Sequence, residues 1–521
     1  MRESAAHQLE KADGTLSNQG QDRPAQWQNV FAAGAGLWLA VALIKFGNPV
    51  ILDHQVTAPT SFSEALMVSW PALWAYCLSI TVLIIGWDCG RRPAWWLAGL
   101  VVAFHWLVLP AQVVFWDAAV AVLALIVLYA WRRPAGLPRW QWIVPLVWLG
   151  WQCIAALRSL SSGDSGQSRL ILMTLQHFAI CVLSFYLGAR IASPDRAGPA
   201  TAARPGPEPQ RLFWLSLGGG FLIVLAVAWR QRFGGLEETR QFFFTLPNWR
   251  SYPPEFIQKL SSDRIYGTLF YPNALAGVIL LLLPIVAVRW WLSSMGLRLR
   301  IGGLAAIVTL GLGALYWSGS KAGWLICLTQ ALVGGLWLGP GGRKRWFLAA
   351  IVLAVGLAGF GLRYRAYLAR GATSVTARFD YWDAAWQGLL NKPAFGSGPG
   401  TFAKTYRELK RPEAEMTRLT HNDFLQQGSD SGVVGLLAYA VWLLGGVGAL
   451  SARLRPRQDL NQFALWLGLA GIILQGFLEF WLYIPAIAWP TLFLFGMALT
   501  TRPPLACATT GNPIDKGWTR H

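Results

Sequence analysis

Charged residues are scarce in this chain: they make up 13% of its 521 residues, against 54% for hydrophobic residues. A soluble domain carries roughly twice that share of charge. Apolar runs recur along almost the whole sequence instead, many of them near the length of about 20 residues that spans a bilayer. The composition therefore excludes a soluble globular protein. It predicts an all-α polytopic integral membrane protein, because backbone groups in lipid must be satisfied within their own helix.

Cysteine and histidine are also rare, with six of each. The cysteines are scattered and show no CxxC or Cys/His spacing, so the sequence predicts neither a metal site nor a disulfide framework. Residues 1–28 are polar and do not resemble a cleaved signal peptide. The formal net charge of +19 would suggest a nucleic-acid partner in a soluble protein. Here membrane topology explains it better, because Lys and Arg accumulate in cytoplasmic loops, and we expect no nucleic acid.

Fourteen apolar segments predict transmembrane helices, and the connections at 110–116 and 482–485 leave the expected number of spans at 12–14. The segments lie near 29–46, 68–86, 94–110, 116–131, 140–157, 170–190, 212–229, 272–292, 301–317, 322–338, 346–362, 432–450, 463–482 and 485–501. With both termini placed in the cytoplasm, 24 of the 44 Lys and Arg lie on the inner side. Of the other 20, 16 lie in two long loops, 230–271 and 363–431. Long loops are exempt from the positive-inside bias, so this topology is self-consistent.

The topology divides the chain into seven parts, and we find no internal repeat or inverted pair of broken helices. An Ala/Pro-rich segment, 193–210, has the composition of a disordered cytoplasmic linker. The parts are a cytoplasmic tail (1–28), an N-terminal bundle containing that linker (29–229), an outer loop (230–271), membrane helices (272–362), a large outer loop with short amphipathic helices (363–431), C-terminal helices (432–501) and a cytoplasmic tail (502–521).

Cations stand beside two of the predicted outer helix ends. Ser320 can cap the next helix, which places Lys321 in the first turn, where a cation opposes the helix dipole. An interfacial lysine that reaches water and a cation belonging to an anion site both fit this position. Pro272 suits the first turn of another helix, and Arg264 precedes it by eight residues, close to the expected membrane surface.

An amphipathic helix is predicted from Arg378 onward, because apolar side chains recur on one face. We expect it to lie on the membrane surface, with Asp380 and Asp383 on its polar side. The sequence GSGPG (396–400) then ends any helix and forms a tight loop. The apolar face comprises Phe379, Trp382, Trp386, Leu389 and Leu390.

Residues 419–439 read LTHNDFLQQGSDSGVVGLLAY, a polar stretch that runs into an apolar helix. Thr420 and Asp423 fit a capping box. His421 would then be the first residue of a short outward helix, about ten residues before the membrane helix begins. The positive end of a helix disfavours imidazolium, so His421 would be neutral and able to accept a proton. The alternative is a surface histidine without a role.

Four of these segments together resemble the O-antigen ligase and polymerase family. In order along the chain they are DRIYGTLFYPNALAG (263–277), SGSKAGW (318–324), RFDYWDAA…NKPAFGSGPGTF (378–402) and THNDFLQQGSDSGVVGLL (420–437). The resemblance implies an inverting glycosyltransferase of the bacterial inner membrane that needs no metal and no cofactor. The donor would be a glycan on polyprenyl (undecaprenyl) diphosphate. The acceptor would be a sugar hydroxyl on lipid A–core, as in lipopolysaccharide, on another lipid-linked glycan, or on a related polymer of polysaccharide biosynthesis.

The resemblance also implies roles for four residues. His421 would activate or position the acceptor hydroxyl. Arg264 and Lys321 would hold the diphosphate, and Arg378 would assist them. The family usually has arginine where this chain has Lys321, so a point charge replaces a bidentate fork.

Two other classes of protein stay open. A lipid-linked glycan transporter or flippase would carry charged residues deep within several helices, whereas the predicted helices carry few, notably Glu479. A non-catalytic scaffold of an envelope polysaccharide complex would tolerate loss of His421. Within the enzyme class, a ligase, a polymerase and a protein-glycosylating variant would use the same donor-activating residues.

Overall fold

The computed structural model describes residues 32–51, 136–161, 165–192, 210–245, 247, 249–251, 257, 261–339, 342–369, 373–455 and 458–501. All regular secondary structure in these ranges is helical. Three of the predicted helices, 68–86, 94–110 and 116–131, lie outside the described residues, as do both predicted tails, 1–28 and 502–521. The predicted linker falls outside them too, except for its last residue.

The helices match the apolar segments of the sequence. The spanning and short apolar helices are Ala32–Lys45, α6 (Arg139–Leu160), α7 (Ser165–Ile191), α8 (Arg211–Arg230), α11 (Pro272–Trp291), α12 (Leu297–Ser318), α13 (Lys321–Leu338), α14 (Arg343–Ala369), α17 (Asp423–Ala440), which continues through η7 (Val441–Gly445) into α18 (Gly446–Ser451), α19 (Leu460–Gln475) and α20 (Pro485–Thr500). Among the described residues, eight helices are long and apolar enough to cross a membrane, and three shorter ones are apolar. The prediction of an all-α polytopic membrane protein is confirmed.

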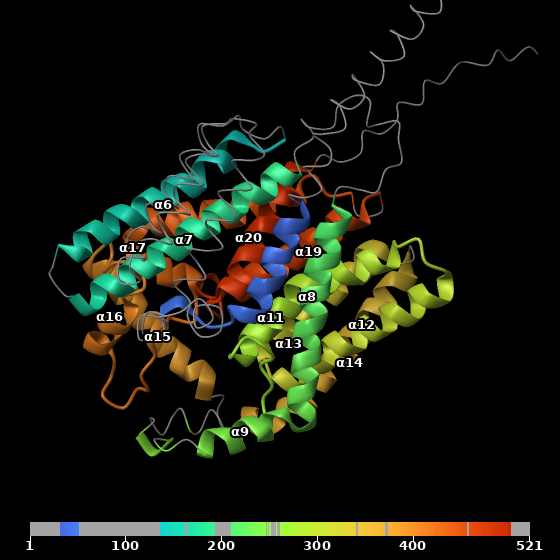
Figure 1. The fold of residues 1–521 in the computed structure, drawn as a ribbon, viewed down its shortest axis with the longest axis horizontal. Coiled ribbons are helices and arrows are strands. Elements are labelled where there is room, and N and C mark those ends of the chain that lie inside the picture. Colours follow the sequence, from blue (N-terminus) through green and yellow to red (C-terminus); the bar gives the residue numbers. More distant parts are fainter. Residues whose placement is uncertain are drawn as a thin grey trace, which may run out of the picture.

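Shorter elements form the two long loops between these helices. They are η5 (Gln231–Gly235), α9 (Leu236–Thr245) and η6 (Trp249–Ser251) in the first loop, and α15 (Thr373–Asn391) and α16 (Phe402–Leu409) in the second, with η8 (Trp481–Tyr483) between α19 and α20. In Figure 1, α15 and α16 lie below α17, and α9 lies below α8. The expected amphipathic helix is present, but it begins at Thr373, so Arg378 lies inside it and not at its start. Phe379, Trp386 and Leu390 of that helix remain exposed.

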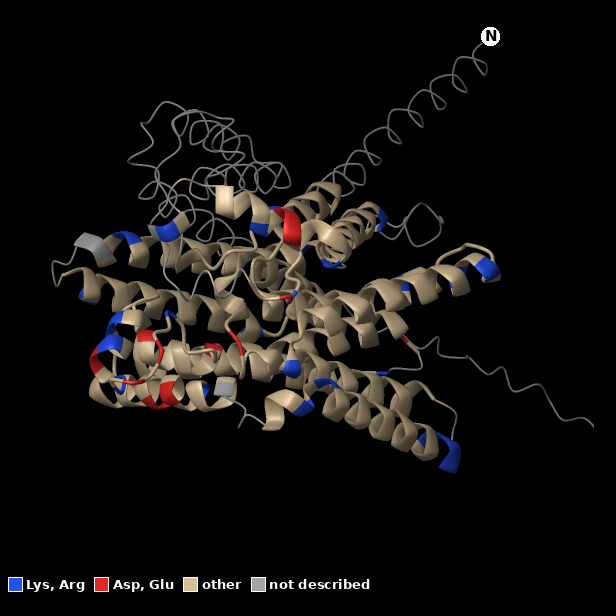
Figure 2. Cartoon of the chain, turned by 90° about the horizontal axis from the view of Figure 1, so that it is seen from below, with Lys and Arg blue, Asp and Glu red and all other residues tan. Residues whose placement is uncertain are grey.

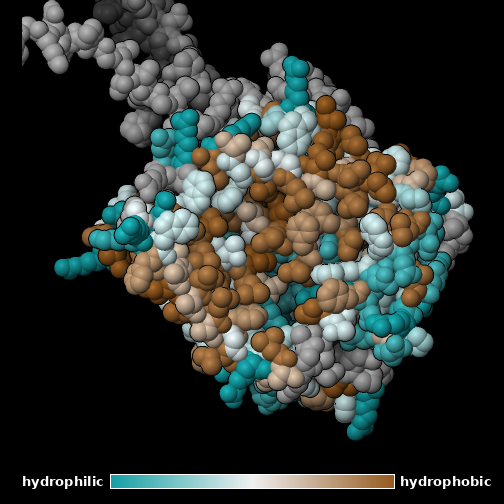
Figure 3. Space-filling model, turned by 180° about the vertical axis from the view of Figure 1, so that it is seen from behind, coloured by the Kyte–Doolittle hydropathy of each residue, from teal (hydrophilic) through white to brown (hydrophobic). Residues whose placement is uncertain are grey.

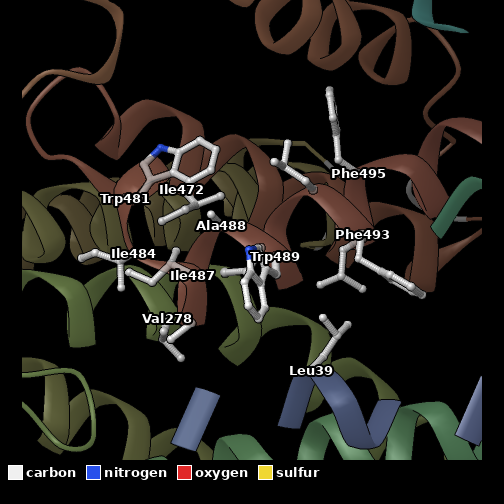
Figure 4. Close-up of a cluster of buried hydrophobic side chains, with 14 of the residues drawn as sticks. Leu39, Val278, Ile472, Trp481, Ile484, Ile487, Ala488, Trp489, Phe493 and Phe495 are labelled. Atoms are coloured by element: carbon white, nitrogen blue, oxygen red, sulfur yellow. The ribbon is translucent and has the colours of Figure 1, made fainter. Parts of the chain in front are cut away.

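Helix α20 occupies the centre of the bundle, and every one of its residues is buried. Figure 1 shows α11 and α19 beside it, with α6, α7 and α17 on one side and α8, α12, α13 and α14 on the other. Figure 4 shows the core around Trp489, with side chains from α19, α20 and α11 pointing toward one another. The Trp489 ring stacks on Trp38 at a centroid distance of 5.4 Å.

Glycines allow α7 and α20 to pack backbone against backbone. A Cβ atom on Gly188 would lie 1.8 Å from the Phe493 carbonyl oxygen, and one on Gly496 would lie 1.9 Å from that of Phe185. Lipid supplies no hydrophobic drive between helices, so such close approaches are a main source of their association.

The outer surface of the bundle is apolar where it would face lipid. Large hydrophobic side chains along α14 are exposed, among them Trp346 and Leu362. Figure 3 shows hydrophobic side chains over much of one face, with hydrophilic ones mostly around its rim. Figure 2 shows Lys and Arg mainly at helix ends and in loops, while long stretches of helix carry neither sign.

Helix α17 is broken at Gly432, where φ is +72° and ψ is −170°. The break separates a first, largely buried half from the membrane helix proper, as the sequence predicted. The freed carbonyl groups of Ser429 and Asp430 accept hydrogen bonds from the N–H groups of Ser397 and Gly398 at 3.0 and 2.9 Å. The predicted tight loop 396–400 therefore completes the backbone hydrogen bonding that the broken helix leaves open.

We predict that Gly188→Ala and Gly496→Ala each lower the melting temperature of the purified protein by several degrees. Alanine in place of glycine normally stabilises a helix by about 0.5–1 kcal/mol, but here the new Cβ would collide with backbone of the facing helix. The matched control is Gly150→Ala in α6, where a Cβ would meet nothing within 4 Å. Thermal unfolding followed by tryptophan fluorescence makes the comparison. Equal melting temperatures for all three variants would contradict the packing described above.

Candidate active site

The four residues singled out in the sequence converge at one end of the helices. Arg264 precedes α11, Lys321 opens α13, Arg378 lies in α15 and His421 precedes α17. The Arg264 Nε donates to the Ser318 carbonyl oxygen at 2.7 Å. Lys321 lies within electrostatic range of both arginines. Segments up to 157 residues apart in the chain therefore meet here, since the cluster runs from residue 264 to residue 421.

Glu479 joins this cluster and connects its parts. Its Oε1 accepts hydrogen bonds from Arg378 and, at 2.6 Å, from Asn273. Its Oε2 lies 3.0 Å from Nδ1 of His421. The expectation that Glu479 lies within a helix of 463–482 is wrong, because α19 ends at Gln475 and Glu479 belongs to the connection to α20. The sequence signal that marks it is a single acidic residue in an otherwise apolar stretch.

The cluster is electrostatically coupled. Burial alone would raise the pKa of Glu479, but His421, Arg378 and Arg264 together outweigh burial and hold this pKa below its ordinary value. Burial lowers the pKa of Arg264, and the Glu479 carboxylate opposes that effect. The Arg264 Nη2 also donates to Asn273 Oδ1 at 2.9 Å, so Asn273 bridges Arg264 and Glu479. One carboxylate therefore serves several cations.

The backbone around His421 differs from the predicted capping box. Asn422 caps α17, with its side chain accepting a hydrogen bond from the N–H of Leu425 at 3.0 Å. Thr420 instead bonds within the turn, its hydroxyl donating to the Asn422 carbonyl at 2.7 Å. His421 consequently lies outside the helix with φ of +52°, a left-handed conformation that is rare for residues other than glycine. Such conformations cluster at functional sites.

The His421 imidazole is enclosed on several sides. Tyr381 stacks on it at a centroid distance of 5.8 Å, and Phe480 packs edge-on at 4.7 Å. The Nδ1 atom of His421 is hydrogen-bonded to Glu479, and Nε2 has no partner among the described residues. The side chain remains 26% exposed. The ring is thus held in place with one nitrogen open to an incoming group.

Asp423 fastens the Glu479 segment to the His421 segment. The Asp423 N–H donates to the Gly476 carbonyl at 2.7 Å, and Asp423 Oδ2 accepts from the Leu482 N–H at 3.2 Å. Both flanks of Glu479 are therefore tied to a residue two positions after His421.

The segment SGSKAGW forms the turn from α12 to α13 as predicted. Ser320 caps α13, accepting from the Gly323 N–H at 3.2 Å, and Lys321 is the first helical residue. Gly319 has φ of +63° and its missing Cβ leaves room for the Arg264 side chain, whose Nε would lie 3.1 Å from such an atom. Lys321 lies over the ring of Tyr367, with Nζ 3.8 Å from the centroid.

Arg363 is a further cation of the cluster that the sequence reasoning missed. It lies at the far end of α14, within electrostatic range of Arg264 and Lys321. Its guanidinium sits 5.0 Å from the ring centroid of Tyr316. Within the described part of the chain, neither Arg363 nor Lys321 pairs with a carboxylate. No group of three or more His, Cys, Asp or Glu in that part could hold a metal ion.

Residues 304–440 match the family described as O-antigen ligase. The match covers 137 of the chain's 521 residues, and over this region the chain is similar to that family. The matched O-antigen ligase region runs from α12 into α17 and contains Lys321, Arg378 and His421, whereas Arg264 and Glu479 lie outside it. No curated protein matches the chain.

We predict that Glu479→Gln lowers the melting temperature at pH 7, because removing one partner of a buried ion pair leaves Arg378 uncompensated, a cost of about 3–5 kcal/mol in other proteins. The folded-state pKa of Glu479 is depressed, so its contribution is fully present above the ordinary pKa of a glutamate. It is lost as pH falls through the depressed value. The gap between wild type and variant should thus shrink below about pH 4.

Thermal unfolding from pH 7 to pH 3.5 measures this gap. Glu413→Gln, which removes an exposed acid from the same outer loop, serves as the control and should show little difference at any pH. A gap for Glu479→Gln that stays constant down to the lowest pH would refute the depressed pKa.

Proposed function

We propose that the protein is a membrane glycosyltransferase of the O-antigen ligase or polymerase type. It would transfer a glycan from a polyprenyl diphosphate carrier to a sugar hydroxyl on lipid A–core or on another glycan. One observation carries the proposal above the others: a histidine with an open ring nitrogen lies in the same cluster as four cations, at one end of the membrane helices. The family match supports the same reaction class.

The cations suit a diphosphate leaving group. As the bond between the sugar C1 and the phosphate oxygen breaks, the electron pair leaves with the diphosphate, and negative charge grows on its oxygens. Charge-assisted hydrogen bonds to such oxygens are strong, and they act most strongly where water is excluded. Arg264 and Arg378 supply planar donors, while Lys321 and Arg363 add charge without a competing carboxylate among the described residues. The site thus favours an anion carrying at least two charges.

His421 suits the acceptor side of the reaction. The acceptor hydroxyl would attack C1 from the face opposite the diphosphate, which inverts the configuration at that carbon. Its proton would pass to Nε2, the ring nitrogen that the structure leaves open. General base catalysis by a histidine contributes typically 10²–10⁴-fold in rate. The proposed reaction thereby balances: one C–O bond forms, one breaks, and the imidazole takes the proton.

The site lies on the side of the helices to which both long loops belong. The cation-rich connections 298–300, 342–345 and 453–455 belong to the opposite ends, because successive helices alternate in direction. We infer that the reaction takes place at the outer, periplasmic face of the bacterial inner membrane, with both termini in the cytoplasm. Ligase and polymerase would then differ only in the acceptor that reaches His421.

We predict that His421→Asn abolishes transfer while the protein still inserts and folds. Asparagine tolerates the left-handed backbone at this position better than alanine, so it removes the imidazole with less strain. His421→Ala and Arg264→Ala should abolish transfer as well. The measurement uses purified protein in lipid with lipid-linked oligosaccharide, following release of free polyprenyl diphosphate and the mass of the glycan product.

The two readouts separate the possible functions. His421-dependent release establishes a glycosyltransferase, and the product mass distinguishes chain growth from transfer to a lipid core. Near-normal turnover in either an Arg264 or a His421 variant would show that the residue's assignment is wrong. No release from folded wild-type protein with any acceptor would favour transport of the lipid-linked glycan or a scaffolding role.

We further predict that Arg363→Gln raises the donor KM several-fold and leaves kcat within about threefold. Arg363 stacks on tyrosine rings at the edge of the cluster and faces no carboxylate there, so it should attract the donor and contribute little to the bond-breaking step. Arg365→Gln, two residues further along the same helix, is the matched control. A fall in kcat with an unchanged KM would instead place Arg363 at the leaving oxygen.

A further inference from the structure

We propose that Glu479 is the positioning residue for His421, holding the imidazole with its proton on Nδ1 so that Nε2 is the nitrogen that accepts the acceptor's proton. This inference rests on the proposed glycosyl transfer and extends it to a residue outside the matched region and outside the four predicted from the sequence. Glu479 itself touches no reacting atom; it acts through His421 and through Arg378.

The two carboxylate oxygens of Glu479 are divided between two tasks. Oε1 accepts hydrogen bonds from Arg378 and Asn273, which lie on the side of the cluster proposed to bind the glycan donor. Oε2 receives only His421, at 3.0 Å from Nδ1. Because a carboxylate accepts and does not donate, the shared proton resides on Nδ1, and the neutral ring must carry its lone pair on Nε2. The geometry therefore selects one tautomer.

The other groups around the ring do not compete for this task. From α15, Tyr381 packs against the ring face, and its hydroxyl donates to Glu415 at 2.7 Å, away from the imidazole. Burial and then Glu415 raise the pKa of Tyr381, so its phenol stays neutral. Arg378 of the same helix is engaged by Glu479.

The remaining elements packed against the pair bring three further charged groups. Asp423 of α17 is occupied by the Leu482 N–H. Arg264, from the segment before α11, bonds to Ser318 and Asn273. Lys321 of α13 lies over Tyr367. Glu479 is thus the only charged group among the described residues that bonds to the His421 ring.

The arrangement also connects the two halves of the reaction. When His421 takes the acceptor proton it becomes imidazolium, and the adjacent carboxylate stabilises that charge. The same carboxylate is the counterion of Arg378 until an anionic donor arrives. Replacing Glu479 by an uncharged residue should therefore slow the chemical step. It should not weaken donor binding, because the diphosphate would no longer compete with a carboxylate for Arg378 and Arg264.

Glu479→Gln tests this in the full-length protein reconstituted in lipid, with kcat and donor KM measured between pH 5 and 9. We expect kcat to fall about 10²-fold or more, the lower end of what a general base contributes, while the donor KM stays unchanged or falls. Glu479→Asp, which keeps the charge, should recover part of the lost kcat.

Three results overturn the proposal. Wild-type kcat in Glu479→Gln would show that the carboxylate is dispensable. A rise in donor KM with an unchanged kcat would indicate a role in donor binding and not in positioning His421. Glu413→Gln is expected to match wild type, and a similar loss there would mean that any lost outer-loop charge has this effect.

A readout independent of turnover separates this inference from the proposed function. Nitrogen-15 spectra of histidine-labelled protein, with the His421 signal identified by its absence in His421→Asn, report which ring nitrogen carries the proton. We expect the Nδ1–H form in wild type and a mixture in Glu479→Gln. The Nε2–H form in wild type would overturn the proposal even if turnover is observed. The expected spectra from a protein without turnover would uphold the positioning role and refute glycosyl transfer.

Discussion

The buried carboxylate of Glu479 is the interaction on which the site depends. A charge removed from water is costly unless it is paired and hydrogen-bonded. Glu479 is 7% exposed, and its partners come from three other parts of the chain: α11, α15 and the turn before α17. Among the described residues, no buried ion pair of this kind joins these three elements directly to one another. The carboxylate therefore fixes their mutual arrangement, and with it the position of His421 relative to the cations.

The cations around Glu479 outnumber the negative charge available to them. Arg378 bonds to the Glu479 carboxylate, and Arg264 bonds to the Ser318 carbonyl oxygen and to the Asn273 amide. Lys321 and Arg363 lie over tyrosine rings instead. Such partners moderate like-charge repulsion but do not cancel it. An arrangement of this kind is poorly satisfied by itself and well satisfied by a multiply charged anion. Its electrostatics thus favour an anionic ligand over a neutral one.

Local features of the sequence predicted local structure well. The apolar runs gave the positions of the helices, and Ser320 and Pro272 marked helix starts because their effects depend only on nearby residues. The capping box at Thr420 failed because Asn422 is an equally good cap two residues later, and spacing alone could not decide between them. Glu479 could not be placed at all from spacing: its partners lie 58, 101 and 206 residues away. Its lone charge in an apolar stretch was a signal, but only the fold shows what it meets.

The distance between His421 and Glu479 is set by the backbone more than by the two side chains. Asp423 ties Gly476 and Leu482, and so holds the Glu479 segment at both ends. Asp430 lies seven residues after Asp423. It accepts hydrogen bonds from the Gly400 N–H and the Tyr483 hydroxyl at 2.8 Å each. The buried first half of α17 thus uses two carboxylates to clamp the loops that surround the site. Ionisable residues at membrane depth are costly and are typically retained for function. Here their role would be to position the site. Catalytic groups must be held to within a fraction of an ångström, and loops at a membrane surface hold them that closely only when a rigid element fixes the loops.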